Sequence, residues 1–205
     1  MNNQYIRNIE LRDDELVDGY LNGDISSFNR ILGRYQAKLF SYIYHYIGNR
    51  QEAEDIFQET FYRVIANLKF YKQKGYFKAW LFKIAFNICI DHIRKKRKVK
   101  ILSMSQQFSN DEAEEVALEN MVASDAPSPA EIANGKEAQK LLREMLGVLP
   151  NAQKEVLLLR IYAGLSFKEI SQVLGCSINT VLGRMQYALG HLRNILKEKG
   201  VIDEL

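Results

Sequence analysis

The sequence of 205 residues has little cysteine, little proline and no long apolar run. Its two cysteines, Cys89 and Cys176, are too far apart for a CxxC pair, so neither a disulfide scaffold nor a zinc finger is predicted. No run of about 18 apolar residues is present, and the N-terminal residues lack the apolar stretch of a signal peptide. These absences predict a cytoplasmic protein with no membrane insertion.

Motifs of the common enzyme classes are also missing. The three histidines, His45, His92 and His191, are remote from one another in the sequence. The patterns HExxH, GxSxG and GxxxxGK followed by Ser or Thr do not occur. We therefore expect no enzyme activity, no catalytic residue, no metal, no cofactor and no small-molecule substrate.

The charged residues are unevenly distributed along the chain. The composition as a whole, 47% hydrophobic and 26% charged, is that of an ordinary globular protein. Residues 1–100 contain 18 basic and 11 acidic side chains, and residues 136–205 contain 10 basic and 7 acidic ones. The intervening residues 101–135 contain 7 acidic side chains and no basic one. Because basic units attract polyanions and an acidic segment is repelled by them, nucleic acid is the first partner to consider.

The acidic stretch contains two of the three prolines and is interpreted as a flexible linker. The predicted organisation is an N-terminal domain over residues 1–98, an acidic linker over 99–135 and a C-terminal domain over 136–205. A short acidic helix over 111–122 within one larger domain is the alternative, because this segment has good helix propensity.

Before the linker, apolar residues recur with helical spacing. One helix is predicted over residues 50–68, opened by a capping box of Asn49 and Glu52. Its expected buried face comprises Phe57, Phe61, Val64, Ile65 and Leu68. A second helix is predicted from Phe77 to Lys98, and it is expected to bury Leu81, Ile84, Ala85, Ile88 and Cys89.

After the linker, helices are predicted over residues 131–147 and after Pro150, followed by two closely linked helices. The first of this pair opens with a capping box of Ser166 and Glu169, and Ser177 caps the second. The expected buried face of the last helix comprises Ile178, Val181, Met185, Leu189, Leu192 and Leu196. This order is typical of a helix-turn-helix, which lays its second helix in the major groove of DNA.

Polar residues on the outer face of the last helix are suited to reading DNA. Their groups match base edges and phosphates, and Arg184 can form a bidentate pair with guanine. Lys168 on the preceding helix is expected to meet a phosphate. The outer set is Ser177, Asn179, Thr180, Arg184 and Tyr187. A plain helical hairpin with a solvated polar face is the alternative.

Lysines alternate with aromatic residues over positions 72–83. Such a mixture suits single-stranded nucleic acid, because lysines neutralise the backbone while flat rings stack on unpaired bases. The residues are Lys72, Lys74, Lys78 and Lys83 with Tyr76, Phe77, Trp80 and Phe82. A basic run over 94–100 then fits either a phosphate contact strip or a solvated helix end. A place in the core is the alternative for the aromatic residues, and Trp80 taken alone fits that alternative better.

An acidic and polar outer face is expected on the helix over residues 50–68. It presents Asp55, Gln58, Glu59 and Tyr62. This face is unsuited to DNA, and it fits either a contact for a basic or polar protein or an ordinary solvated surface.

Patterns at both ends of the chain combine in one family. The pattern F-x-x-W-L-x-x-I-A-x-N-x-x-x-D-x-x-R is met by Phe77, Trp80, Leu81, Ile84, Ala85, Asn87, Asp91 and Arg94. Asp55, Gln58 and Phe61 match D-x-x-Q-x-x-F, and the C-terminal part matches L-P, E-I, L-G, S-x-x-T-V, R and L-R in order. Over residues 12–98 and 136–197 the chain resembles bacterial sigma factors of the extracytoplasmic-function group.

The resemblance implies an all-α protein of two small helical domains joined by a flexible acidic linker, the second a helix-turn-helix. It implies core RNA polymerase, promoter DNA and an anti-sigma factor as partners, with the linker threading toward the RNA exit. The implied polymerase contacts are Asp55, Gln58, Glu59, Phe61 and Tyr62. The implied minus-ten contacts are Lys72, Lys74, Phe77, Trp80, Lys83, Asn87, Arg94 and Lys95. The implied minus-thirty-five contacts are Lys168, Ser177, Asn179, Thr180, Arg184 and Tyr187.

Three positions of the last helix depart from the family pattern. Leu182 stands where Lys is frequent, Gly183 precedes the arginine, and Asn179 stands where Gly is frequent. The first alternative is a stand-alone helix-turn-helix regulator that binds duplex DNA as a dimer, and the second is a helical enzyme. A regulator of that kind does not require the aromatic, single-strand chemistry of the N-terminal part.

Overall fold

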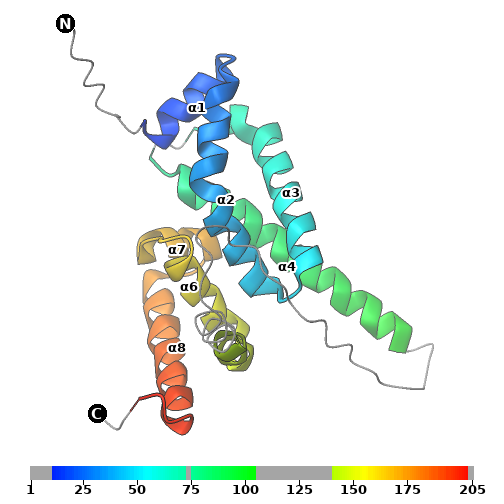
Figure 1. Cartoon of the computed structure of the whole chain (residues 1–205), viewed down its shortest axis with the longest axis vertical. Coiled ribbons are helices and arrows are strands. Elements are labelled where there is room, and N and C mark those ends of the chain that lie inside the picture. Colours follow the sequence, from blue (N-terminus) through cyan, green and yellow to red (C-terminus); the bar gives the residue numbers. More distant parts are fainter. Residues whose placement is uncertain (1–10, 73–74, 105–139, 203–205) are drawn as a thin grey trace, which may run out of the picture.

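The computed structural model describes residues 11–72, 75–104 and 140–202, and all regular structure within these ranges is helical. The all-α prediction is therefore confirmed. The N-terminal group comprises α1 (Asp13–Leu21), α2 (Ile25–Ile47), α3 (Arg50–Asn67), the short 3-10 helix η1 (Leu68–Phe70) and α4 (Phe77–Met104). The C-terminal group comprises a helix over 140–148, α6 (Asn151–Ile161), α7 (Phe167–Leu174) and α8 (Ile178–Glu198). Figure 1 shows the first group above the second, with α4 crossing behind α2 and α3.

Short polar side chains and one glycine set the helix ends around α2 and α3. Asp24 caps α2 by accepting a hydrogen bond from the backbone of Ser26. Gly48, at a φ of 82°, ends α2 in the left-handed region. Asn49 then caps α3 by accepting from the Glu52 backbone at 3.0 Å. The predicted capping box is only half formed, because the Glu52 carboxylate binds side chains of α4 instead.

Helix α3 buries a face rotated from the predicted one. Val64 and Leu68 are buried as predicted, and so is Phe61, whereas Phe57 is half-buried and Ile65 is exposed. The difference arises because α3 contacts both α2 and α4, so its buried face is set by two neighbours. The other buried residues of α3 are Ala53, Ile56 and Thr60.

Helix α4 continues to Met104, beyond the predicted end at Lys98. The first residues of the predicted linker, 99–104, are therefore helical. Residues 105–139, with most of the acidic stretch, lie outside the described residues, as do positions 131–139 of a predicted helix. The predicted core positions Leu81, Ala85, Ile88 and Cys89 are buried, and Ile84 is half-buried.

The helix-turn-helix is formed by α7 and α8. The capping box of Ser166 and Glu169 is present, and Ser177 caps α8, as predicted. The buried face of α8 differs: Val181 is buried, but Ile178 and Leu189 are exposed. At 21 residues, α8 is much longer than α6 and α7, so neither neighbour covers its whole apolar face. The other fully buried residue of α8 is Ala188, and Met185, Leu192 and Leu196 are half-buried.

The two helical groups are packed against each other. Helix α7 contacts α4, and α6 contacts α2. In the part of the chain that the structure describes, no helix is both long and apolar enough to span a membrane.

Candidate nucleic-acid interface

A groove of about 250 Å³ lies between the C-terminal end of α3, η1 and the first half of α4. It is lined by Arg63, Asn67, Phe70, Trp80, Ile84 and Asn87. A guanidinium, two amides and two aromatic rings therefore meet on one surface. Hydrogen-bonding groups beside flat rings suit an unpaired base, which offers both a polar edge and a π-face.

The aromatic residues of the sequence-predicted set divide between this groove and the core. Trp80 is half-buried and lines the groove. Phe77 and Phe82 are fully buried, so the structure places Phe77 in the core, and its contact with DNA stays a prediction. The physical reason is that Phe77 fills the space between Tyr35 and Tyr71, with ring centroids 5.8 and 5.7 Å away.

Phe70 is a groove residue that sequence reasoning missed. Its side chain is 65% exposed, and the Lys69 ammonium lies 5.0 Å from its ring centroid. An exposed ring with a cation over it combines a stacking surface with a positive charge. The sequence does contain a signal for it, because Lys69, Phe70 and Tyr71 extend the alternation of lysines and aromatic residues that continues from Lys72.

Two lysines in the first half of α4 contact the C-terminal group. Lys78 Nζ donates to the Gly164 carbonyl at 2.9 Å, and Lys83 Nζ donates to the Gln172 carbonyl at 3.2 Å. Lys72 is exposed, and Lys74 lies outside the described residues. The predicted minus-ten residues of α4 therefore lie on two sides of the helix. Lys83 faces α7, whereas Trp80 and Asn87 line the groove beside α3.

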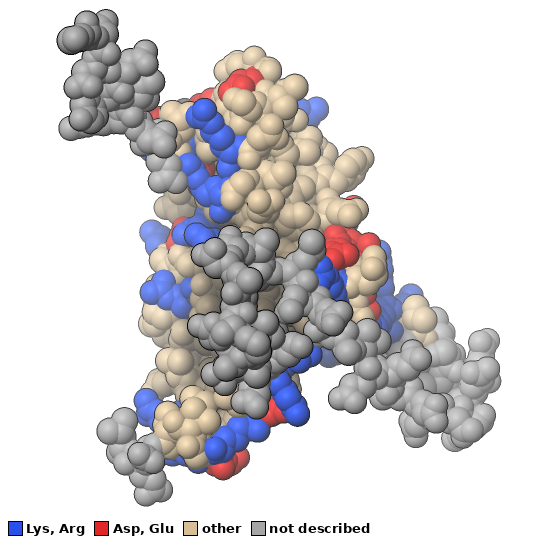
Figure 2. Space-filling view, in the orientation of Figure 1, with Lys and Arg blue, Asp and Glu red and all other residues tan. Residues whose placement is uncertain are grey.

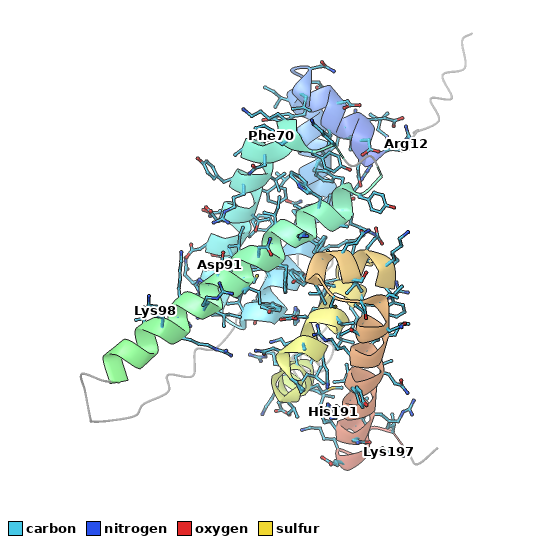
Figure 3. All side chains as sticks on the ribbon, turned by 180° about the vertical axis from the view of Figure 1, so that it is seen from behind. Arg12, Phe70, Asp91, Lys98, His191 and Lys197 are labelled. Carbon is cyan, nitrogen blue, oxygen red and sulfur yellow. The ribbon has the colours of Figure 1, made fainter. Side chains whose placement is uncertain are left out.

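The basic end of α4 extends away from the C-terminal helices, as the position of Lys98 in Figure 3 shows. Arg94 and Lys95 are exposed. Glu52 of α3 accepts hydrogen bonds from His92 Nε2 at 2.7 Å and Lys96 Nζ at 2.5 Å. Burial opposes ionisation of Glu52, but these two donors hold the pKa of its carboxyl below the usual value. Helix α3 thus holds one side of this basic segment.

The outer face of α8 is open at its N-terminal end. Asn179, Thr180 and Tyr187 are exposed, as are Ser177 and, on α7, Lys168. The Ser177 hydroxyl caps the backbone of Thr180 at 3.0 Å and also contacts its hydroxyl. Arg184 is half-buried, with Nη1 4.0 Å from Cys176 Sγ, and so differs from the fully outward position that was predicted. Lys and Arg side chains are spread over both helical groups on the face in Figure 2.

Polar groups join α2 to α6 and the residue that follows it. The ring of Tyr162 stacks on His45 at 4.8 Å between centroids, and its hydroxyl lies 3.2 Å from His45 Nε2. Tyr46 donates to Glu155 at 3.0 Å, while Lys154 Nζ donates to the Tyr46 carbonyl at 3.2 Å. The contact between the helical groups is therefore partly polar and titratable.

The neutral form of His45 fits this contact. Since His45 Nδ1 must donate to the Ser41 carbonyl at 2.7 Å, Nε2 of the neutral ring is left to accept from Tyr162. Burial lowers the pKa of His45; the Ser41 carbonyl opposes this effect, and Lys154 reinforces it. Burial raises the pKa of Glu155, against the hydrogen bond from Tyr46 and the charge of Arg184.

We expect His45 to make the stability of the protein depend on pH. Because its pKa is lowered from 6.5 in the folded state, the unfolded chain binds the proton more tightly, and the free energy of unfolding falls as the pH drops below 6.5. Denaturant unfolding over about pH 5.5–7.5 checks this. The raised pKa of Glu155 changes stability with pH in the opposite direction. The parent protein is therefore compared with His45→Gln, in which the free energy of unfolding should depend less steeply on pH. A His45→Gln variant that keeps the parent slope contradicts the assignment.

Two family models match the chain in the order of its helical groups. The model for Sigma-70 region 2 matches residues 31–99, and the model for Sigma-70 region 4 matches residues 139–192. The ECF RNA polymerase sigma factor SigW of Bacillus subtilis (strain 168) is 29% identical over 176 residues, which cover 86% of this chain and 92% of SigW. The chain belongs to the extracytoplasmic-function group of the sigma-70 family.

Two solved structures share the fold of this sigma factor. CnrH, solved in complex with the cytosolic domain of CnrY, has a TM-score of 0.65 at 22% identity and covers 91% of this chain and 97% of its own. The sigma factor RpoE of Bartonella quintana, solved with the anti-sigma factor NepR, has a TM-score of 0.65 at 23% identity and covers 84% of this chain and 98% of its own. Both likenesses concern the fold alone.

The predicted polymerase-binding residues of the sigma factor lie on α3. Asp55, Gln58 and Tyr62 are exposed, and Tyr62 is 71% exposed despite its large ring. Glu59 pairs with Arg63 at 2.7 Å. Phe61 is buried and packs against Phe57 and Phe28, so the structure places it in the core, and its direct contact with the polymerase stays a prediction. It supports the exposed face from inside.

Proposed function

We propose that this sigma factor joins core RNA polymerase, directs it to promoters and assists DNA opening, without enzymatic activity of its own. The observation that carries the proposal is the groove beside Trp80. It supplies single-strand chemistry in the same chain as a helix-turn-helix whose outer face is open. A stand-alone duplex-binding regulator does not account for that groove.

The groove residues are proposed to hold unpaired bases of the non-template strand at the minus-ten element. Phe70 and Trp80 supply rings, whereas Arg63, Asn67 and Asn87 supply hydrogen-bonding groups. Lys72, Arg94 and Lys95, all exposed, neutralise the phosphates on either side. Lys83 joins them only where its bond to α7 is released. The predicted Lys74 lies outside the described residues.

The outer face of α3 is proposed to contact the polymerase. Asp55, Gln58 and Tyr62 form an exposed polar and aromatic surface. Its one charged residue, Asp55, is acidic, which disfavours DNA. The C-terminal unit is proposed to begin near residue 136. The acidic residues before it are proposed to thread toward the RNA exit of the polymerase.

An anti-sigma factor is proposed as a further partner. The support is the fold shared with the sigma factor RpoE, which was solved with the anti-sigma factor NepR.

Helix α8 is proposed to read the minus-thirty-five element through Asn179, Thr180, Ser177 and Tyr187, with Lys168 at a phosphate. We expect Asn179→Ala to lower transcription from a promoter that depends on this element about tenfold, because one bidentate amide–base pair is worth about 1–3 kcal/mol. The control is Asn194→Ala, at an exposed asparagine near the other end of the same helix. Equal output from both variants and the parent would remove Asn179 from the reading set.

Run-off transcription tests the proposed function. Purified core polymerase from the source bacterium is assayed with and without this protein on a genomic promoter library. Start sites that depend on the protein support the proposal and reveal both promoter elements. Absence of such sites, together with tight polymerase-free binding to a palindromic duplex, would favour the dimeric regulator instead.

A further inference from the structure

The segment that leads into α4 is fastened to the start of α1. Asp14, the second residue of α1, accepts a hydrogen bond from the backbone N–H of Gly75 at 2.7 Å through Oδ2. Its Oδ1 accepts from the Tyr71 hydroxyl at 3.1 Å. The Tyr71 oxygen accepts in turn from the backbone N–H of Tyr76 at 3.3 Å. The Asp14 carboxylate thus binds both Tyr71 and Gly75, which are 57 and 61 positions further along the sequence.

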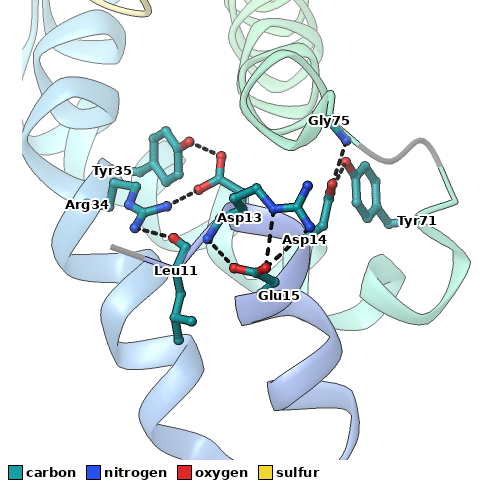
Figure 4. A network of polar contacts seen from close by, with 9 residues as sticks. Leu11, Asp13, Asp14, Glu15, Arg34, Tyr35, Tyr71 and Gly75 are labelled. Carbon is teal, nitrogen blue, oxygen red and sulfur yellow. Dashed lines mark hydrogen bonds and ion pairs between the residues drawn. The ribbon is translucent and has the colours of Figure 1, made fainter. Parts of the chain in front are cut away.

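The carboxylate itself is held in a fixed place. Its neighbour Asp13 contacts Arg34 and Tyr35 of α2, and Arg34 also donates to the Leu11 carbonyl at 2.8 Å. Leu16, one turn further along α1, is fully buried. Figure 4 shows the two sets of contacts side by side, with Asp13 directed at α2 and Asp14 directed at Tyr71 and Gly75. Helix α2 therefore positions α1, and α1 positions the entry to α4.

The contacts of Tyr71 continue to the groove. Its ring centroid lies 5.2 Å from that of Trp80 and 5.7 Å from that of Phe77. Gly75 has a φ of 84°, a conformation for which glycine carries no steric penalty, and it stands two residues before Phe77 begins α4. A shift of Tyr71 or Gly75 would therefore move the Trp80 ring, which lines the groove.

We propose that Asp14 is a positioning residue for single-strand capture, because its bonds to Tyr71 and Gly75 fix the entry to α4 and the Trp80 ring. This inference rests on the proposed function of the groove. The partner is the non-template strand of the opened promoter, and Asp14 acts on it through Tyr71 and Trp80 without touching it. Hydrogen bonds to a charged carboxylate are stronger than neutral ones, so a single side chain is enough for this role.

The test measures binding of a fluorescent single-stranded oligonucleotide to the assembled polymerase holoenzyme. The oligonucleotide carries the non-template minus-ten sequence of a promoter mapped by run-off transcription. We expect Asp14→Asn to weaken this binding about tenfold, as loss of a charge-assisted hydrogen bond implies. Affinity for core polymerase and for minus-thirty-five duplex should stay at the parent values. Asp18→Asn, the same change at an exposed position of α1, is the matched control.

A second variant separates positioning from folding. Tyr71→Phe keeps the ring and removes the hydroxyl, so it should weaken the same binding in the same direction. The double variant should lose less than the sum of the two single losses, because both side chains take part in the bond between Asp14 and the Tyr71 hydroxyl. Parent-like binding by both single variants overturns the inference, and so does an equal loss of affinity for core polymerase, which would show a merely structural role. A parent holoenzyme that does not bind the oligonucleotide overturns the proposed function and the inference with it.

Discussion

Trp80→Ala is expected to weaken binding of the holoenzyme to single-stranded minus-ten DNA by about 5- to 150-fold. The range follows from the roughly 1–3 kcal/mol that one stacked base contributes. Trp80 is half-buried against Tyr71 and Phe77, so its ring is held in one orientation and little freedom is lost when a base stacks on it. The measurements are oligonucleotide affinity and permanganate reactivity of melted thymines at a mapped promoter.

Two further variants distinguish stacking from loss of packing. Trp80→Phe keeps a ring and should retain most of the affinity. Phe70→Ala removes a ring that is 65% exposed, so it should reduce strand binding with little effect on the free energy of unfolding. If Trp80→Ala binds the oligonucleotide like the parent while the protein remains folded, the groove is not the strand-binding surface.

Phe82→Ala is expected to lower the free energy of unfolding by about 3–5 kcal/mol. Phe82 is fully buried, and its ring meets that of Tyr42 edge to face at 5.5 Å. Deleting the ring leaves a cavity where α2 and α4 meet. Because a domain is stable by only about 5–15 kcal/mol, the loss is a large share of the total. Guanidinium unfolding followed by circular dichroism measures it.

Tyr42→Phe is the matched control at the other ring of this pair. Tyr42 is fully buried, and its hydroxyl has no hydrogen-bond partner among the described residues. Removing only that hydroxyl keeps the packing, so the free energy of unfolding should stay equal or rise by about 1 kcal/mol. A Phe82→Ala protein as stable as the parent would show that the α2–α4 junction is not the core of the N-terminal group.

Local signals in the sequence predicted the helix caps well. The caps at Ser166 and Ser177 depend on residues three positions apart, so the sequence contains both partners of each bond. The same holds for Asn49 at α3. The prediction failed for the Glu52 side chain, because its partners, His92 and Lys96, are 40 and 44 positions away. Nothing near Glu52 in the sequence marks them.

Side-chain burial explains where the structure departs from the positions expected from the sequence. Phe77 and Trp80 both fit an aromatic strip in the sequence, but α4 turns Phe77 into the core and Trp80 toward the groove. Ile65 and Ile178 share an apolar spacing with buried neighbours and yet are exposed, since none of the described helices covers them. Periodicity identifies which residues share a helix face, whereas the neighbouring helices decide which part of that face is buried.

The sequence by itself determined the helical class, the helix-turn-helix, the acidic division between two basic units and the family. These features depend on composition, on spacing within one helix and on caps a few residues long. Only the tertiary structure decided that Phe70 and Trp80 share a groove with Asn87, that Lys78 and Lys83 bind the C-terminal group, and that Asp14 holds Gly75. Each of these joins different helices or the segments beside them, and such contacts depend on how whole helices pack, which no local pattern encodes.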